Sequence, residues 1–92
     1  MFTPKTVVKQ SANQVSCTLN DEIAILSLDK SVYFGLEGVG ADLWQALETP
    51  RSVAELCKLI LDSYDVDAQQ CEADVLDFLH KMQEAGLLET VD

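Results

Sequence analysis

Catalysis needs particular side chains close together, and this sequence offers few candidates. A nucleophile needs a base beside it, and acid–base chemistry needs a histidine or a pair of carboxylates held in different environments. The single histidine, His80, falls on the flank of a predicted helix, between its apolar stripe and its polar face. A solvated or packing histidine is therefore the simpler interpretation. Many of the 16 acidic residues are spread along helix faces, where carboxylates usually face solvent.

The three cysteines, Cys17, Cys57 and Cys71, are the other side chains that could bind a metal or form a bridge. A structural zinc site needs closely spaced ligand pairs such as C-x-x-C, and these cysteines have no such spacing. All three lie within apolar patterns, and their number is odd. We therefore expect buried thiols in a reducing compartment, with neither a metal nor a disulfide.

Gly35, Gly38 and Gly40 are spaced loosely like a phosphate-binding loop. Such a loop also needs a lysine and a parallel strand–loop–helix unit, and neither is predicted here. A carrier protein would hold phosphopantetheine on a serine in a DSL-like motif at a helix start. Ser27 lies in a strand pattern and Ser52 follows an arginine, so neither fits. We interpret the glycines as a tight corner and expect no cofactor.

The charge of the chain argues against two classes of partner. Six lysines and arginines stand against 16 acids, for a net charge of −10. A surface that binds nucleic acid or an anionic membrane must neutralise phosphates, so both are poor candidates. No apolar run approaches the roughly eighteen residues that span a bilayer, and the N-terminus lacks the apolar segment of a secretory signal. We expect a single cytoplasmic domain.

The first half of the chain has the pattern of strands. Residues 1–14 are weakly patterned, and we expect a loose N-terminal arm before a domain that spans 15–92. Apolar residues alternate over 15–19, are nearly continuous over 23–28, and are β-branched or aromatic over 32–36. Two tight turns join these segments. They predict an antiparallel meander with the second strand in the centre and the third at an edge.

The second half has the pattern of helices. Apolar residues recur at spacings of three and four over 39–47, which predicts a first helix. Ser52 and Glu55 form an S-x-x-E capping box at the start of a second helix. Asp67 is the expected N-cap of a third helix over about 68–85. The sequence thus predicts an α+β domain, in which a three-stranded antiparallel meander is followed by three helices.

The edge strand gives a physical route to peptide binding. Its outer N–H and C=O groups are unpaired, and an extended peptide can pair with them while its side chains enter neighbouring pockets. The third helix would supply those pockets through an apolar stripe, although the same stripe also fits an ordinary core. The stripe residues are Val75, Phe78, Leu79 and Met82.

Several motifs together resemble the PqqD-like family, in the same order and over about residues 15–90. They are Y-F-G-L-x-x-V-G-A-x-L-W at 33–44, S-V-A-E-L at 52–56, Y-D-V-D at 64–67, D-V-x-x-F-L at 74–79 and G-L-L at 86–88. The family is known as the RiPP recognition element, a winged-helix-like domain that binds the leader segment of a ribosomally made precursor peptide. This variant resembles most the stand-alone recognition protein of lasso-peptide systems, which works beside a separate cysteine leader peptidase and a cyclase.

The resemblance implies that a leader docks as a strand against 32–36, with its apolar anchors between this strand and the third helix. It nominates Val32, Tyr33, Phe34 and Gly35 on the strand and Val75, Phe78, Leu79 and Met82 on the helix. Strand alternation turns Tyr33 and Phe34 to opposite faces and leaves open which of them faces the groove. We assign the core to Leu36, Leu43, Trp44, Leu56 and Ile60.

Two other functions remain as alternatives. The winged-helix shape keeps a DNA-binding regulator in view, although the acidity of the chain opposes it. A PqqD-like domain that serves a radical SAM enzyme would have the same fold and groove with a different partner. We expect a non-catalytic binding protein. The leader sequence, the face that meets the peptidase and the oligomeric state stay open at this point.

Overall fold

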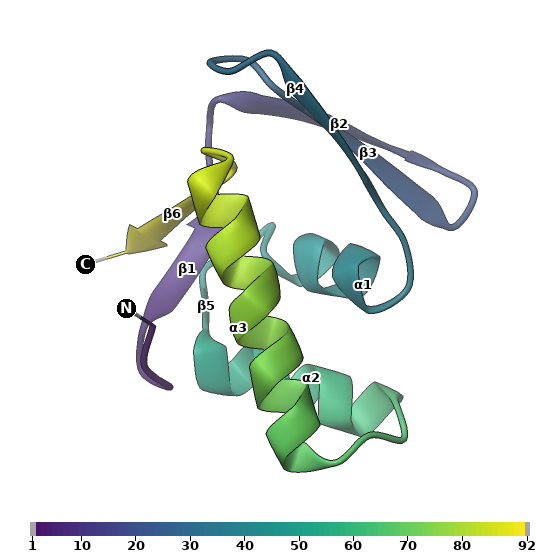
Figure 1. The fold of residues 1–92 in the computed structure, drawn as a ribbon, viewed down its shortest axis with the longest axis vertical. Helices are drawn as coiled ribbons and strands as arrows, with labels where there is room; N and C mark the ends of the chain where they lie inside the picture. Colours follow the sequence, from purple (N-terminus) through teal and green to yellow (C-terminus); the bar gives the residue numbers. More distant parts are fainter. Residues whose placement is uncertain (1, 92) are drawn as a thin grey trace.

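The first half of the chain folds into an antiparallel meander. The computed structural model describes residues 2–91, which contain two three-stranded sheets and three helices (Figure 1). The meander has the order β2-β3-β4, and its strands are β2 (Gln14–Leu19), β3 (Glu22–Ser27) and β4 (Val32–Leu36). Asn20, in the turn from β2 to β3, has a φ of 60°, a left-handed conformation that asparagine tolerates. The predicted meander is therefore confirmed, with its second strand in the centre and its third strand at an edge.

Three helices follow the meander in the described part of the chain. They are α1 (Val39–Ala46), α2 (Val53–Ser63) and α3 (Ala68–Glu84). The predicted capping box begins α2: the Glu55 N–H donates to Ser52 Oγ over 3.1 Å, and the Ser52 N–H donates to Glu55 Oε1 over 3.0 Å. Asp67 caps α3 as predicted, because its Oδ1 accepts from the Gln70 N–H over 2.8 Å. The α+β fold class is confirmed.

A second, smaller sheet joins the two ends of the described chain. Its order is β5-β1-β6, and its strands are β1 (Val7–Gln10), β5 (Arg51–Ser52) and β6 (Leu88–Val91). Our expectation of a loose arm over 1–14 is wrong: β1 is paired on both sides and Val8 is fully buried. No local pattern reports this pairing, because β6 lies at the far end of the sequence. Residues 1 and 92 lie outside the described range.

The segment before β1 also supports the start of α2. The Val53 N–H donates to the carbonyl of Thr6 over 3.0 Å, and the Ala54 N–H donates to the carbonyl of Pro4 over 3.1 Å. The first N–H groups of a helix have no partner within the helix, so these two carbonyls satisfy donors that would otherwise need water. The N-terminal residues are therefore part of the same folded unit as the helices.

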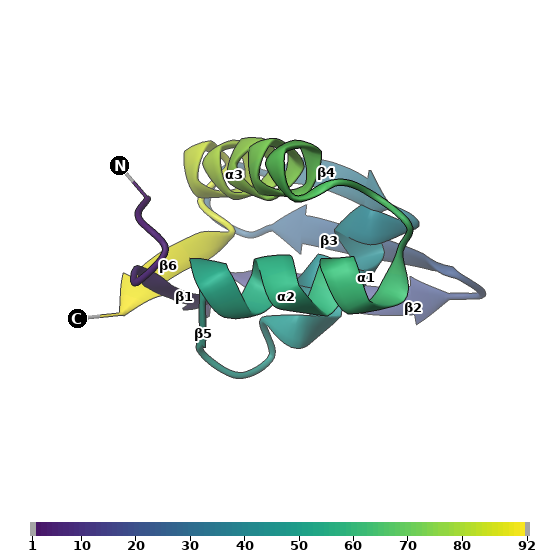
Figure 2. The same ribbon diagram turned by 90° about the horizontal axis from the view of Figure 1, so that it is seen from below.

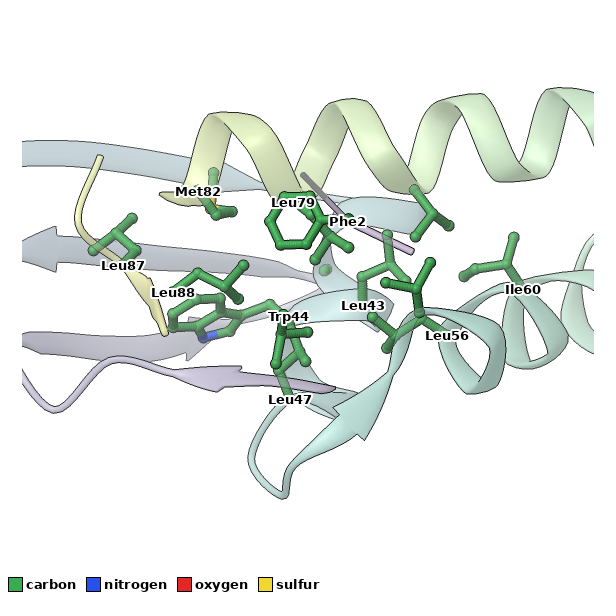
Figure 3. Close-up of a cluster of buried hydrophobic side chains, with 14 of the residues drawn as sticks. Phe2, Leu43, Trp44, Leu47, Leu56, Ile60, Leu79, Met82, Leu87 and Leu88 are labelled. Carbon is green, nitrogen blue, oxygen red and sulfur yellow. The ribbon is translucent and has the colours of Figure 1, made fainter. Parts of the chain in front are cut away.

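The core lies where the helices meet the two sheets. Figure 3 shows side chains from α1, α2, α3 and β6 pointing toward one another around Trp44. The predicted core residues Leu43, Trp44, Leu56 and Ile60 are at most 2% exposed, which confirms their assignment. Leu36, which we also assigned to the core, is only half-buried and packs against its edge. Truncating a buried leucine of this kind to alanine costs about 2–5 kcal/mol, so this cluster fixes the position of α3.

Two of the three cysteines lie where the sequence suggests. Cys71 is buried and Cys57 is half-buried; burial raises the pKa of both thiols, and the Cys71 thiol donates to the Cys57 carbonyl over 3.5 Å. Cys17 is exposed instead, because it pairs with Ala24 on the solvent-facing side of the meander. Alternation alone does not say which face of a strand is covered, and this face is open. All three cysteines are free.

Candidate functional site

Strand β4 is an edge strand with a helix beside it. It pairs with β3 on one side, and no other strand of the described residues pairs with its second side. Figure 2 shows α3 and β4 on the same side of the molecule, with α1 and α2 on the other. The unpaired backbone of β4 is therefore next to a helix surface, which is the arrangement that strand addition requires.

A groove of about 670 Å³ lies between β4 and α3. Its apolar lining comes from Val32, Phe34 and Leu36 on β4 and from Phe78, Met82 and Ala85 at α3. Leu36 and Phe78 both lie beside Gly40 at one end of the groove, where a Cβ atom at position 40 would be 3.6 Å from Leu36 Cδ2 and 3.7 Å from Phe78 Cε1. The groove thus has an apolar floor and wall along the full length of the edge strand.

The register of β4 shows which strand residues reach the groove. Phe34 pairs with the buried Ile25, so it lies on the inner face of the sheet, and it lines the groove. Tyr33 pairs with Leu26 on the outer face and is 67% exposed. Gly35 alternates with Phe34 and shares the outer face. Of the four strand residues nominated from the sequence, Val32 and Phe34 line the groove, and Tyr33 and Gly35 do not.

The four nominated residues of α3 divide in the same way. Phe78 is half-buried and lines the groove, and Met82, which is only 4% exposed and belongs to the core, contributes to the groove floor. Val75 and Leu79 are fully buried in the core, which corrects their assignment to a binding surface. At 100° per residue, Val75 and Leu79 differ by only about 40° around the helix axis, whereas Phe78 lies about 100° from Leu79, toward the groove. The apolar stripe read from the sequence is wider than the groove, and its centre is core.

Charged side chains on the rim were missed by the sequence reasoning. They are Lys30, Asp74, Asp77, Lys81 and Glu84. Lys81 Nζ pairs with Asp77 Oδ2 over 3.0 Å, and Lys30 Nζ donates to the carbonyl of Glu84. Asp74 Oδ1 accepts from Gln70 Nε2 over 2.8 Å. Asp74, Phe78 and Met82 are spaced four residues apart, so they are neighbours on one side of the helix. This spacing could have predicted that charged residues border the groove.

His80 lies away from the groove. It is exposed, and its ring packs edge-on against Phe2 with ring centroids 5.0 Å apart. This agrees with the packing role favoured by the sequence. A smaller hollow of about 390 Å³ nearby has walls from the N-terminal segment, α2 and α3, and includes Phe2, Leu61 and Leu76. No unpaired strand edge is part of its lining.

The outer face of the meander carries a row of exposed apolar side chains. Val15 is opposite Leu26, and Leu26 is opposite Tyr33, so the row crosses all three strands. They are 57%, 41% and 67% exposed, respectively. We call these three residues the outer row. Cross-strand neighbours of this kind make a continuous apolar surface, in contrast to isolated exposed residues.

Residues 2–91 contain neither a cluster of metal-ligating side chains nor a membrane-spanning helix. No group of three or more histidine, cysteine or acidic side chains there is arranged to hold a metal ion. No helix there is long and apolar enough to cross a membrane. The groove beside β4 and the outer row are therefore the surfaces that an account of function has to explain.

Comparison with solved structures finds close matches over nearly the whole chain. The structure of TbiB1 in complex with the TbiA(beta) leader peptide is 37% identical and covers 88% of this chain and 94% of TbiB1, with a TM-score of 0.83. A lasso peptide synthetase B1 complexed with its leader peptide is 17% identical and covers 89% of this chain and 96% of that one, with a TM-score of 0.78. A comparison with curated proteins finds no match.

A third match is the solution NMR structure of the PqqD part of PqqCD from Methylobacterium extorquens, described as a functional, stand-alone RiPP recognition element. It is 18% identical and covers 97% of this chain and 95% of that one, with a TM-score of 0.77. At such identities the second and third matches establish the shared fold. The family model described as coenzyme PQQ synthesis protein D (PqqD) matches residues 22–88, which is most of the chain. This chain therefore belongs to the PqqD family.

Proposed function

We propose that this protein binds the leader segment of a ribosomally made precursor peptide of the lasso type, by strand addition to β4. The observation that carries this proposal is the apolar groove along an unpaired strand edge. The similarity to TbiB1, which is in complex with a leader peptide and is 37% identical to this chain, supports it. The resemblance of the motifs at 33–88 to the recognition protein of lasso-peptide systems favours the lasso type over a partner of a radical SAM enzyme.

The dimensions of the groove suit a short extended segment. From Asp74 to Ala85, α3 advances about 16 Å at 1.5 Å per residue. Five residues of strand, at about 3.3 Å each, have a similar length. Such a segment would gain backbone hydrogen bonds along β4, each worth about 0.5–1.5 kcal/mol net. Its alternate side chains would point into the groove and bury apolar surface there. The proposed contacts are Val32, Phe34, Leu36, Phe78 and Met82.

The proposed role is non-catalytic and needs no cofactor. A bound leader would raise the effective concentration of its cleavage site near a leader peptidase, which is the proposed partner, with a cyclase acting afterwards. The proposed site of action is the cytoplasm, where ribosomes make the precursor. This role requires a peptide-binding site and a surface that contacts the peptidase, and it requires no catalytic side chain.

The outer row is the surface we propose for the peptidase. A leader strand added to β4 would extend the same sheet, so its outward side chains would continue the row formed by Val15, Leu26 and Tyr33. A partner that docks on this row would contact the protein and the bound leader together. Such a surface would let the peptidase recognise the loaded protein in preference to the empty one.

Fluorescence anisotropy tests the proposed function. The probe is a labelled peptide with the leader sequence of the precursor encoded beside this gene. Controls are a scrambled leader and a labelled DNA duplex. We expect saturable binding of the leader with a Kd in the micromolar range or below, and no binding of either control. Failure of the leader to bind, with and without the peptidase, would contradict the proposal. Binding of the duplex would favour the regulator instead.

A further inference from the structure

The two ends of the groove carry different charge. At the end where β4 begins, Lys30 reaches the C-terminal end of α3. Its Nζ donates to the carbonyl of Glu84, and its Cε would lie 3.7 Å from a Cβ atom at position 86, which is glycine. Lys81 and Asp77 pair in the middle. Along the rim from Lys30 to Lys81, the positive charges of these two lysines are therefore matched by the negative charges of Asp77 and Glu84.

The other end of the groove, where Leu36 and Phe78 lie beside Gly40, is acidic. Asp74 lies one helical turn before Phe78 and lines this end of the groove. A small hollow of about 220 Å³ opens beside Leu36, and its other lining residues are Gly35, Glu22 and Glu37. Neither of the two ion pairs found within residues 2–91 involves Asp74, Glu22 or Glu37.

These carboxylates flank the end of the β4 edge from both faces of the sheet. Asp74 comes from α3, on the inner side, with Phe34 and Leu36. Glu37 follows Leu36, and Glu22 precedes Ile23, the residue paired with Leu36, so by alternation both lie toward the outer face. Adjacent residues of an added strand would also alternate between these faces. Either one could bring a cation to a carboxylate.

We propose that the leader carries lysine or arginine at one or both of the two adjacent positions beside Leu36, where Asp74 selects a basic side chain on the inner face and Glu37 selects one on the outer face. This inference rests on the proposed function. The groove itself is apolar and would accept many peptides, so the charge at its ends supplies selectivity and register. A neutral or acidic side chain at the same place would face uncompensated carboxylates on a chain whose net charge is already −10.

The charge difference also orients the leader. The pairing of β3 with β4 is antiparallel, and purely antiparallel sheets are favoured over mixed ones. A leader added antiparallel to β4 would start beside Leu36 and leave beside Val32. The basic residues therefore belong on the N-terminal side of the apolar anchors, and residues on the C-terminal side pass Lys30.

Charge reversal tests this inference. The variants are Asp74→Lys, Glu37→Lys and the double variant, with Glu72→Lys as the matched control. Glu72 is an exposed acid on the same helix, and it lines the hollow between α2 and α3 in place of the groove. All three substituted positions are exposed, and circular dichroism checks that the four variants fold. Affinity is measured by anisotropy at low and high salt, with the labelled leader and with a leader whose basic residues before the anchors are changed to glutamate.

We expect each groove variant to weaken leader binding about 3- to 10-fold at low salt and the control to change it less than 2-fold, since rim charges contribute modestly and are screened. The wild type should bind the glutamate leader more weakly than it binds the natural leader. The double variant should bind the glutamate leader more tightly than the wild type binds it. If the wild type binds the natural leader but no charge change on either partner matters, the charge inference fails and the proposed function stands. If the wild type binds no leader, the proposed function itself fails.

Discussion

The meander has two unpaired edges, β2 and β4, and they differ in what lies beside them. Along β4 runs an apolar groove of about 670 Å³. No such groove follows β2 in the described residues: the hollow of about 300 Å³ at the β2–β3 turn includes one β2 residue, Thr18, and has a polar lining with Asp42, Gln45 and Tyr64. Both edges offer the same unpaired backbone groups. Unpaired backbone alone therefore does not make a peptide site, because the neighbouring side chains decide what an added strand can bury.

The largest expected effect comes from the wall behind β4. Val75→Glu places a carboxylate at a fully buried position of α3. We expect it to destabilise the fold by at least ~3 kcal/mol, because an unpaired buried charge has no compensating partner there. Urea denaturation followed by circular dichroism measures this. Leu76→Glu, at the half-buried neighbouring position, is the control and should cost less. A stable Val75→Glu variant would show that this residue is not core.

The next effect separates the two edges directly. Val32→Asp and Val15→Asp make the same change at exposed positions of β4 and β2. Val32 lines the groove, so we expect its change to weaken leader binding by roughly tenfold or more, the equivalent of about 1.4 kcal/mol. The Val15 change should stay within twofold. Equal losses of leader affinity in the two variants, measured by anisotropy, would mean that the leader does not bind preferentially at the β4 edge.

A smaller effect on leader binding is expected from the outer face. Tyr33→Asp changes a β4 residue that points away from the groove. We predict leader affinity within about threefold of the wild type, because rim and outward positions contribute little. Cleavage of the precursor by the peptidase should fall much more than binding, since the outer row is its proposed surface. Full cleavage with Tyr33→Asp would remove the outer row from the account, and the groove would stand.

The smallest effect is expected from the hydrogen bond between Tyr64 and Asp42, in the hollow at the β2–β3 turn. Tyr64 Oη donates to Asp42 Oδ2 over 2.5 Å, and this hydrogen bond, with burial and the Asp42 charge, raises the pKa of Tyr64 above its usual value. A raised folded-state pKa means that the extra stability is present at neutral pH and is lost as the pH rises through the tyrosine range, about 10 and above. We expect the Tyr64→Phe variant to be slightly less stable than the wild type at pH 7. Its free energy of unfolding should fall less between pH 7 and pH 11 than that of the wild type, and its leader binding should be unchanged. Urea titrations at pH 7 and pH 11 measure this. A larger alkaline loss in the variant would contradict it.

The sequence predicts local features of the fold well. The capping box at Ser52, the N-cap at Asp67 and the three strands of the meander depend on neighbours within a few residues, and all are present. The second sheet was missed because β1 and β6 come from opposite ends of the chain. A short strand has a weak pattern of its own, and only its distant partners make it stable.

The candidate site was only partly predictable for a related reason. Hydrophobic period identifies the apolar stripe of α3, but it does not separate Leu79, in the core, from Phe78, in the groove. Likewise, alternation puts Tyr33 and Phe34 on opposite faces without saying which face α3 covers. That choice depends on how the helix packs on the sheet. The charged rim was missed because isolated acids on a helix usually face solvent.

Amide hydrogen exchange, measured by NMR on the labelled protein with and without leader, tests the central claim most directly. Backbone N–H groups that gain a partner in an added strand exchange more slowly. Strand addition at β4 predicts that leader binding slows exchange of amides in β4, Val32–Leu36, and leaves those in β2, Gln14–Leu19, unchanged. Slowing in β2, or saturable leader binding without slowing in β4, would contradict strand addition at the groove.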